Sequence, residues 1–204
     1  MDINTCDKYN FESLILEKPK KNDDVYLSSI SNSSTTIQTP KLTINKLTKK
    51  LTLLLNEPME KLFNDFDSKI VSLISEKSKD FFEEQLSIED TEEIYKHSIR
   101  QTREETKITV SLNKNLTIYN KHKENLDVST ICKDDNVICL LKCKKIVFYK
   151  NYCEPLWEVL QIKLKEPELD LKKYLFIDDK DDNYIDDNDN DDNLKDIKKI
   201  KMKV

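Results

Sequence analysis

Hydrophobic residues between positions 58 and 84 recur at steps of three and four, the spacing that places side chains on one face of an α-helix. The recurring positions are Leu62, Phe66, Ile70, Leu73, Ile74 and Phe81. Asn56 and Pro58 mark the helix start, because an asparagine side chain caps free N–H groups and proline needs no N–H in the first turn. The pattern predicts a long amphipathic helix over residues 58–84 and, after Ser87, a shorter helix over residues 88–100.

Beyond residue 100 the hydrophobic period changes from helical to alternating, which is typical of strands with one buried face. Ile108, Val110 and Leu112 share one face of a strand over residues 107–112. The other predicted strands cover residues 41–44, 51–55, 116–121, 137–150 and 156–164. We therefore predict a mainly β protein with α-helix, in which a compact antiparallel sheet closes into a small barrel and the long helix docks on it.

Composition indicates one domain and excludes several classes of enzyme. The chain has 204 residues, of which 37% are hydrophobic, and this is enough for one core. It contains no glycine, which excludes a Walker loop, a dinucleotide-binding G-x-G-x-x-G motif and a G-x-S-x-G nucleophile elbow. No run of residues is apolar enough for a membrane span, so we expect a soluble intracellular protein with reduced cysteines.

Charge divides the chain into a basic body and an acidic tail. Residues 95–165 carry 14 Lys and Arg against 8 Asp and Glu, whereas residues 178–192 carry nine Asp and one Lys. Many like charges with few apolar groups predict a disordered tail over residues 178–204, acidic first and basic at its end. We further expect a poorly ordered segment over residues 1–36 and the folded domain over residues 37–177.

The acidic tail also suggests regulation. A flexible acidic segment can occupy the basic face of its own domain until a polyanion displaces it, and it can engage basic partner proteins meanwhile. The aspartates that we expect to act in this way are Asp178, Asp179, Asp181, Asp182, Asp186 and Asp187.

Aromatic and basic residues share the predicted outward faces of three strands. Strict alternation along residues 156–164 directs Trp157, Gln161 and Lys163 outward, while most leucines turn inward. The corresponding sets on earlier strands are Lys144, Phe148 and Lys150, and Tyr119 with Lys121. Such a face suits single-stranded nucleic acid, because exposed bases stack on aromatic rings for about 1–3 kcal/mol each and lysines neutralise the phosphates.

These positions receive separate roles in the predicted interface. Trp157, Tyr119 and Phe148 are expected to stack on bases, Lys121, Lys144, Lys150 and Lys163 to contact phosphate, and Gln161 to hydrogen-bond to bases or sugar. Contacts of this kind predict binding without sequence preference. A slip of one residue in the strand would transfer the role of Phe148 to Tyr149. The competing interpretation is that Trp157 belongs to the core and the lysines form an ordinary solvated face.

Three segments carry a resemblance to a known family. WEVLQIK (Trp157–Lys163), YLFIDD (Tyr174–Asp179) and IQTPKLTI (Ile37–Ile44) resemble the single-stranded DNA-binding proteins of large eukaryotic (nucleo-cytoplasmic) DNA viruses, which are similar to a short-tailed-phage type. The resemblance implies an OB-like β-barrel with an added helix and an acidic tail. It also implies a viral protein that coats and protects single-stranded DNA during replication, recombination or repair.

The same resemblance implies where the protein acts and with what. The protein would act in the host cytoplasm, in a viral replication factory or in the nucleus. Its partners would be single-stranded DNA and replication proteins that bind the acidic tail. Homo-oligomerisation stays open at this point, and so does the choice between DNA and RNA.

Metal and enzyme chemistry find little support in the residues. Cysteines 132, 139, 143 and 153, with His122, lack the short chelating pair typical of structural zinc sites. The only histidines are His97 and His122, and neither lies in an H-E-x-x-H motif. We therefore expect no metal, no cofactor and no enzymatic activity. The alternative function is a non-catalytic structural or interaction protein, such as a virion, scaffold or acidic-tailed chaperone component, that uses the same sheet without DNA.

Overall fold

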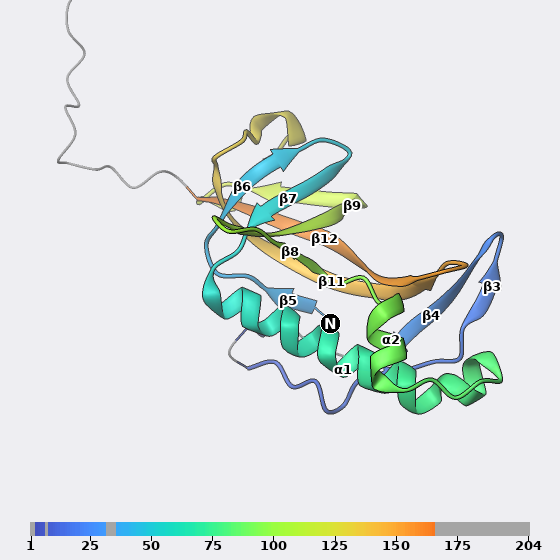
Figure 1. The fold of residues 1–204 in the computed structure, drawn as a ribbon. Helices are drawn as coiled ribbons and strands as arrows, with labels where there is room; N and C mark the ends of the chain where they lie inside the picture. The colour runs from blue at the N-terminus through green and yellow to red at the C-terminus, as the bar shows by residue number, and fades with distance from the viewer. Residues whose placement is uncertain (1–2, 7, 32–35, 166–204) are drawn as a thin grey trace, which may run out of the picture. The chain divides into compact units, whose positions relative to one another are not determined.

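A barrel of five strands forms the centre of the fold (Figure 1). The structure is a computed structural model that describes residues 3–6, 8–31 and 36–165. The barrel strands are β6 (Leu42–Leu47), β7 (Lys50–Leu54), β9 (Thr106–Tyr119), β11 (Asn136–Phe148) and β12 (Cys153–Lys165). They pair in the order β6–β7–β9–β12–β11, and β11 closes the ring by pairing with β6. This confirms the predicted OB-like fold, with β9 and β12 as a parallel pair in an otherwise antiparallel barrel.

Alternating hydrophobic residues fill the barrel interior, as the sequence pattern predicts. The fully buried members include Ile44, Leu51, Leu53, Ile108, Val110, Ile118, Val137, Cys139, Leu141, Val159 and Ile162. Two predicted strands, residues 107–112 and 116–121, prove to be one strand, β9, with solvent-accessible Lys114 and Asn115 in its middle.

A β-bulge in β12 changes which residues face the core. The pairing of β12 with both β11 and β9 shifts between Val159 and Gln161, so Leu160 is the extra residue. Trp157 and Val159 therefore point inward before the bulge, whereas Gln161 and Lys163 point outward after it. The prediction that residues 156–164 alternate strictly, with Trp157 on the same outer face as Gln161 and Lys163, is wrong because of this bulge.

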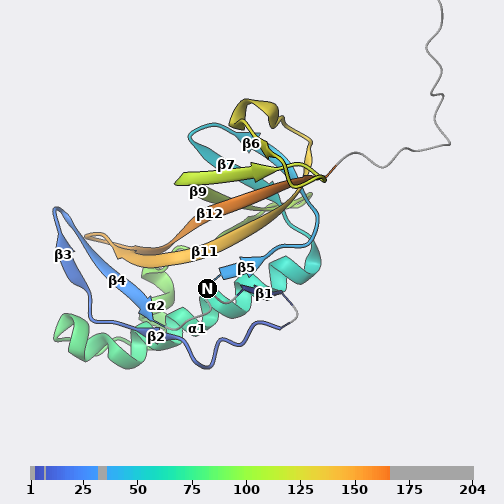
Figure 2. The same cartoon turned by 180° about the vertical axis from the view of Figure 1, so that it is seen from behind.

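Residues expected to be poorly ordered contribute strands instead. The segment over residues 1–36 contains β1 (Ile3–Thr5), β2 (Ile15–Leu16), β3 (Lys20–Asn22), β4 (Val25–Ser31) and the start of β5 (Thr36–Gln38). β4 and β5 both pair with β11, and Leu14 and Leu16 are buried in the core. Hairpin β3–β4 projects beside the barrel (Figure 2).

Two helices follow β7. α1 (Glu57–Phe82) starts at Asn56, whose side chain accepts from the Met59 N–H, and its apolar stripe is buried. The predicted long helix is thereby confirmed within two residues. α2 (Ile88–Ile94) is capped by Ser87 and is shorter than predicted. After it the chain turns extended and forms β8 (Ile99–Gln101), while β10 (Asn125–Leu126) follows β9.

The chain divides into two units, Met1–Pro167 and Glu168–Val204, and the fold above belongs to the first. The six aspartates assigned to tail regulation lie outside the described residues, as does the predicted tail over residues 178–204. Within the described residues, neither helix has the length and apolar character that crossing a membrane requires.

Candidate nucleic-acid interface

Trp157 is a core residue and not an exposed stacking platform. Its side chain is only 3% exposed, and its ring packs edge-on against Phe63 and Phe66 of α1 at centroid distances of 5.0 and 4.9 Å. A ring buried to this extent leaves no face on which a base could stack. The stacking role predicted for Trp157 is therefore wrong, because Trp157 lies before the bulge of β12, where its side chain points into the core.

Phe148 is buried as well, and its neighbour takes the accessible position. Phe148 is 6% exposed and contacts Phe82, whereas Tyr149 is 37% exposed in the turn between β11 and β12. Tyr149 stacks on Tyr152 with centroids 4.5 Å apart, and the Lys96 ammonium lies 3.2 Å from the Tyr152 ring centre. The stacking role predicted for Phe148 is wrong for the folded state, and the one-residue slip places Tyr149 at the surface beside exposed Lys150.

Three predicted residues do come together in one concave surface, which we call the Tyr119 groove. Tyr119 and Lys163 are direct neighbours across the β9–β12 pairing, and Gln161 lies two pairs away along β12, opposite Thr117. The groove has a volume of about 530 Å³. Its lining comprises Ile3, Gln38, Tyr119, Asn120, Lys123, Ile138, Cys139, Leu140, Gln161, Ile162 and Lys163.

The Tyr119 groove combines one aromatic ring, amides, cations and apolar walls. Ile138 lies opposite Lys163 and Leu140 opposite Gln161 in the β11–β12 register, so the groove has an apolar side. Lys123 stands at the turn after β9, where its φ of 66° tightens the chain. A flat, partly apolar ligand with polar edges, such as a nucleobase, fits this chemistry.

The remaining predicted lysines lie apart from this groove. Lys121 is exposed in the loop after β9, and Lys144 is exposed at an irregular position of β11. The Lys144 ammonium lies 3.6 Å from a carboxylate oxygen of Glu158, whose other oxygen accepts a 2.9 Å hydrogen bond from Asn113. Lys144 therefore already has an acidic partner on the sheet surface.

A second concave surface, the Arg100 groove, lies across β7, β8, β9 and β12, and the sequence did not predict it. Its volume is about 380 Å³. The lining comprises Lys50, Thr52, His97, Ser98, Arg100, Lys107, Thr109, Ser111, Glu154, Pro155, Leu156 and Trp157. Lys50 comes from a strand far in the sequence from Arg100 and Lys107, and all three meet only through the pairing of β7 and β8 with β9, so no local motif could have marked them.

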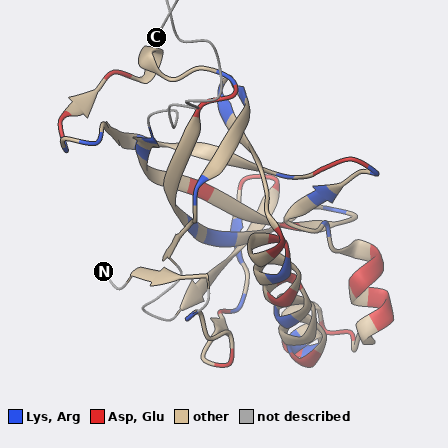
Figure 3. Ribbon diagram, turned by 90° about the vertical axis from the view of Figure 1, so that its left-hand side faces the viewer, with Lys and Arg blue, Asp and Glu red and all other residues tan. Residues whose placement is uncertain are grey.

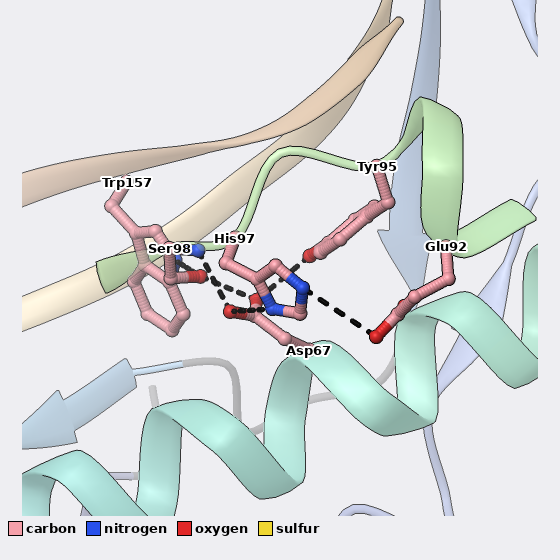
Figure 4. A network of polar contacts seen from close by, with 6 residues as sticks. All are labelled: Asp67, Glu92, Tyr95, His97, Ser98 and Trp157. Atoms are coloured by element: carbon pink, nitrogen blue, oxygen red, sulfur yellow. Dashed lines mark hydrogen bonds and ion pairs between the residues drawn. The ribbon is translucent and has the colours of Figure 1, made fainter. Parts of the chain in front are cut away.

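A polar network around the buried Asp67 adjoins the Arg100 groove (Figure 4), and its members His97, Ser98 and Trp157 line the groove. The Asp67 carboxylate is fully buried and accepts hydrogen bonds from the Ser98 N–H (2.7 Å), the Ser98 hydroxyl (2.6 Å) and the Tyr95 hydroxyl (2.8 Å). The Trp157 indole N–H donates to the Ser98 hydroxyl at 2.9 Å. The network thus ties α1, the segment after α2, and β12 together.

Burial dominates the electrostatics of this network. Loss of solvent raises the pKa of Asp67, although the hydrogen bonds from Ser98 and Tyr95 and the nearby His97 act in the opposite direction. The same burial, with the Asp67 charge, raises the pKa of Tyr95. His97 lies at the rim with Nδ1 3.5 Å from Asp67 and Nε2 3.5 Å from Glu92.

The cysteines do not converge on a metal. In the described part of the chain no group of three or more histidine, cysteine or carboxylate side chains has metal-binding geometry. Cys139, Cys143 and Cys153 are buried, and burial raises the pKa of Cys139 and of Cys153 to about 12, so their thiols stay protonated. They act as small hydrophobic residues of the core.

Comparisons with known proteins give a family and distant structural likenesses. The single-stranded DNA-binding protein from bacteriophage Enc34, in complex with ssDNA, is 12% identical with a TM-score of 0.44, over 77% of this chain and 97% of that one. The single-stranded DNA-binding protein encoded by bacteriophage T7 is 11% identical with a TM-score of 0.46, over 70% and 98%. No curated protein matches the sequence. The model of the family of unknown function DUF5871 matches residues 40–178, and the chain belongs to this family.

Proposed function

We propose that the protein binds single-stranded DNA without sequence preference through the Tyr119 groove. The supporting observation is that Tyr119, Gln161 and Lys163, three positions chosen from strand pattern for ring stacking, hydrogen bonding and phosphate contact, line one concave surface. The groove is of a size that takes a nucleotide, and Lys123 adds a second cation. Stacking and charge tolerate any base, so sequence tolerance follows from this set of groups.

The turn between β11 and β12 offers a second stacking position. Tyr149 stacks on Tyr152 and exposes part of its ring, and Lys150 follows it in the chain. Tyr149 thereby takes the role that the sequence pattern assigned to Phe148. A base on Tyr149 and a base on Tyr119 would lie at opposite ends of the β11–β12 ribbon, so a strand in contact with both must run along the barrel.

The biological role that we infer is coating and protection of single-stranded DNA during viral DNA replication, recombination or repair. The support is the resemblance of three sequence segments to viral single-stranded DNA-binding proteins, two of which lie partly or wholly in β5, β6 and β12. In this proposal the protein is not an enzyme, and the acidic tail meets replication proteins. Lys121 and Lys144 remain candidate phosphate contacts.

Equilibrium binding to fluorescein-labelled oligo-dT, with duplex DNA of equal length as the competitor, tests the proposal. Tyr119→Ala should weaken binding about 5- to 150-fold, the equivalent of one lost base stack. Ile15→Ala is the control, since Ile15 is an apolar side chain 54% exposed on β2 that lines neither the Tyr119 groove nor the surface around Tyr149. Failure of the wild-type chain to bind oligo-dT at low salt, or equal losses for both variants, would overturn the proposal and favour the interaction-protein alternative.

A further inference from the structure

We propose that the Arg100 groove is a separate binding site for the sugar–phosphate backbone of the same DNA strand. This inference rests on the proposed function, because it assigns a second segment of contact to a strand held in the Tyr119 groove. It is carried by the charge and the hydroxyl groups of the Arg100 groove and by the buried network that adjoins it.

Three cations from three strands converge on the Arg100 groove. Arg100 of β8 lies directly opposite Lys107 of β9, and Lys50 of β7 lies opposite Ser111 of β9. Lys107 and Ser111 are four residues apart on one strand, about 13 Å, so the cations follow the length of the groove. Positive charge in a row, and not at one point, suits a chain of phosphates.

Two of these three cations have no carboxylate partner in the part of the chain that the structure describes and can pair with phosphate. Lys107 forms an ion pair with Glu105, but among the described residues no carboxylate forms an ion pair with Lys50 or Arg100. Glu154 is the one carboxylate among the lining residues of the Arg100 groove. The groove therefore carries an excess of positive charge, even though the adjoining helix α2 is acidic (Figure 3).

Hydroxyl groups alternate with the cations along the groove. Thr109 and Ser111 follow Lys107 on the same outward face of β9, and Thr52 follows Lys50 on β7. The hydroxyls of Thr52 and Thr109 lie 3.0 Å apart. Such groups donate hydrogen bonds to phosphate and sugar oxygens. The lining holds two rings, the buried Trp157 and the half-exposed imidazole of His97, which lies between Asp67 and Glu92, so the groove offers no large free ring on which a base can stack.

The buried network fixes the segment that delivers Arg100. Asp67 holds Ser98 by two hydrogen bonds, and Arg100 follows two residues later as the middle residue of β8. Asp67 is thus a positioning residue for the groove. A prearranged cation loses less side-chain freedom on binding, which favours affinity.

The two grooves are close enough for one strand. Leu156 lines the Arg100 groove and Gln161 lines the Tyr119 groove, and five residues of β12, about 16 Å, separate them. Between them Glu158 holds Lys144 on the sheet surface, and a passing phosphate would compete with Glu158 for this lysine. A strand of several nucleotides therefore reaches both grooves.

The salt dependence of binding tests the inference. Each phosphate neutralised on a single strand contributes about 0.7 to the slope of log affinity against log salt. The variant with Lys50→Gln, Arg100→Gln and Lys107→Gln should lower the magnitude of this slope by about 2 in titrations of the full chain with oligo-dT. A control variant with the same loss of charge carries Lys20→Gln, Lys21→Gln and Lys79→Gln, all exposed residues away from both grooves.

The outcomes separate this inference from the proposed function. Binding by the wild-type chain with the same slope in the groove and control variants would overturn the Arg100 site and leave the Tyr119 groove intact. A lower slope in the groove variant alone, with the loss caused by Tyr119→Ala unchanged, would support the site. If the triple variant does not fold, Arg100→Gln alone should lower the slope by about 0.7, and an unchanged slope overturns the inference.

Discussion

The Tyr119 groove and the Arg100 groove share strands β9 and β12 but differ in chemistry. The Tyr119 groove has one tyrosine ring, amides, two lysines and apolar walls, whereas the Arg100 groove has three cations, hydroxyl groups and a buried polar network beneath it. The bulge at Leu160 lies between them on β12. Before it Trp157 points into the core, and after it Gln161 and Lys163 point out. One extra residue therefore allows a single strand to anchor a helix at one end and present polar side chains at the other.

The difference teaches that the surfaces to which we assign base contact and backbone contact have different structural support. The Arg100 groove rests on a network that joins α1, β12 and the segment before β8. The Tyr119 groove rests on barrel strands β9, β11 and β12 and on β1 and β5, and its lining includes no residue of a helix. Substitutions beneath the Arg100 groove should lower the free energy of unfolding, and substitutions in the Tyr119 groove should act chiefly on DNA binding.

The largest expected effect is on folding and comes from Trp157→Ala. This change removes two aromatic contacts and the indole hydrogen bond to Ser98, so we expect a loss of about 3–5 kcal/mol in unfolding free energy. Tyr119 is half-buried at the surface, so Tyr119→Ala should lower the free energy of unfolding by less than about 1 kcal/mol. Urea unfolding of the two variants measures the contrast. Similar losses for both would show that the two grooves do not differ in their support.

The position of Trp157 also shows how far the sequence predicts this protein. The period of α1, the strands and the closure into a barrel follow from hydrophobic spacing. Strict alternation along β12 assigns Gln161 and Lys163 correctly to the outer face but fails for Trp157, because the bulge at Leu160 separates them. Nothing in the sequence around Leu160 marks this bulge. Phe148 and Tyr149 are adjacent, so only the register of β11 decides which one is exposed.

The Arg100 groove marks the limit of prediction from local sequence. Lys50, Arg100 and Lys107 gain their common surface from the pairing of β7 and β8 with β9. A pattern read along one segment contains no such pairing. Asp67 was equally unpredictable, since a lone aspartate on an amphipathic helix reads as a solvated charge until its partners Ser98 and Tyr95 are known.

The second expected effect is a pH dependence that belongs to Asp67. Because burial raises the pKa of Asp67 in the folded state, the folded protein retains a proton that the unfolded chain has lost. The contribution of Asp67 to stability is thus greatest at low pH and falls as pH rises from about 3.8 through the folded pKa. Each pKa unit by which the folded and unfolded states differ lowers the unfolding free energy above the folded pKa by about 1.4 kcal/mol.

Asp67→Asn measures this effect, because asparagine does not titrate. The unfolding free energy of the wild-type chain minus that of the variant should decrease as pH rises from 4 to 7. The opposite trend would mean that the hydrogen bonds from Ser98 and Tyr95 outweigh burial, and that the network beside the Arg100 groove holds a stabilised charge.

The third effect separates base contact from backbone contact. Abasic sites in oligo-dT should weaken binding by the wild-type chain by about 1–3 kcal/mol for each lost stack. Tyr119→Ala should show a smaller loss, since one stack is already absent, whereas the Lys50, Arg100 and Lys107 variant should keep the full loss. Equal sensitivity in both variants would contradict the division of roles between the grooves.

The smallest effect concerns the hydroxyl groups of the Arg100 groove. Thr52→Val and Thr109→Val keep the strand-forming, β-branched shape but remove the hydroxyls that lie 3.0 Å apart. These hydroxyls hydrogen-bond to each other, so one of them has its proton free for a phosphate oxygen, and removing that hydroxyl should weaken oligo-dT binding by about 0.5–1.5 kcal/mol. The salt slope should stay the same, because no charge is lost and no counterion release changes. Unchanged affinity, together with a slope that still falls in the lysine and arginine variant, would restrict the site to its cations and make the groove a purely electrostatic contact.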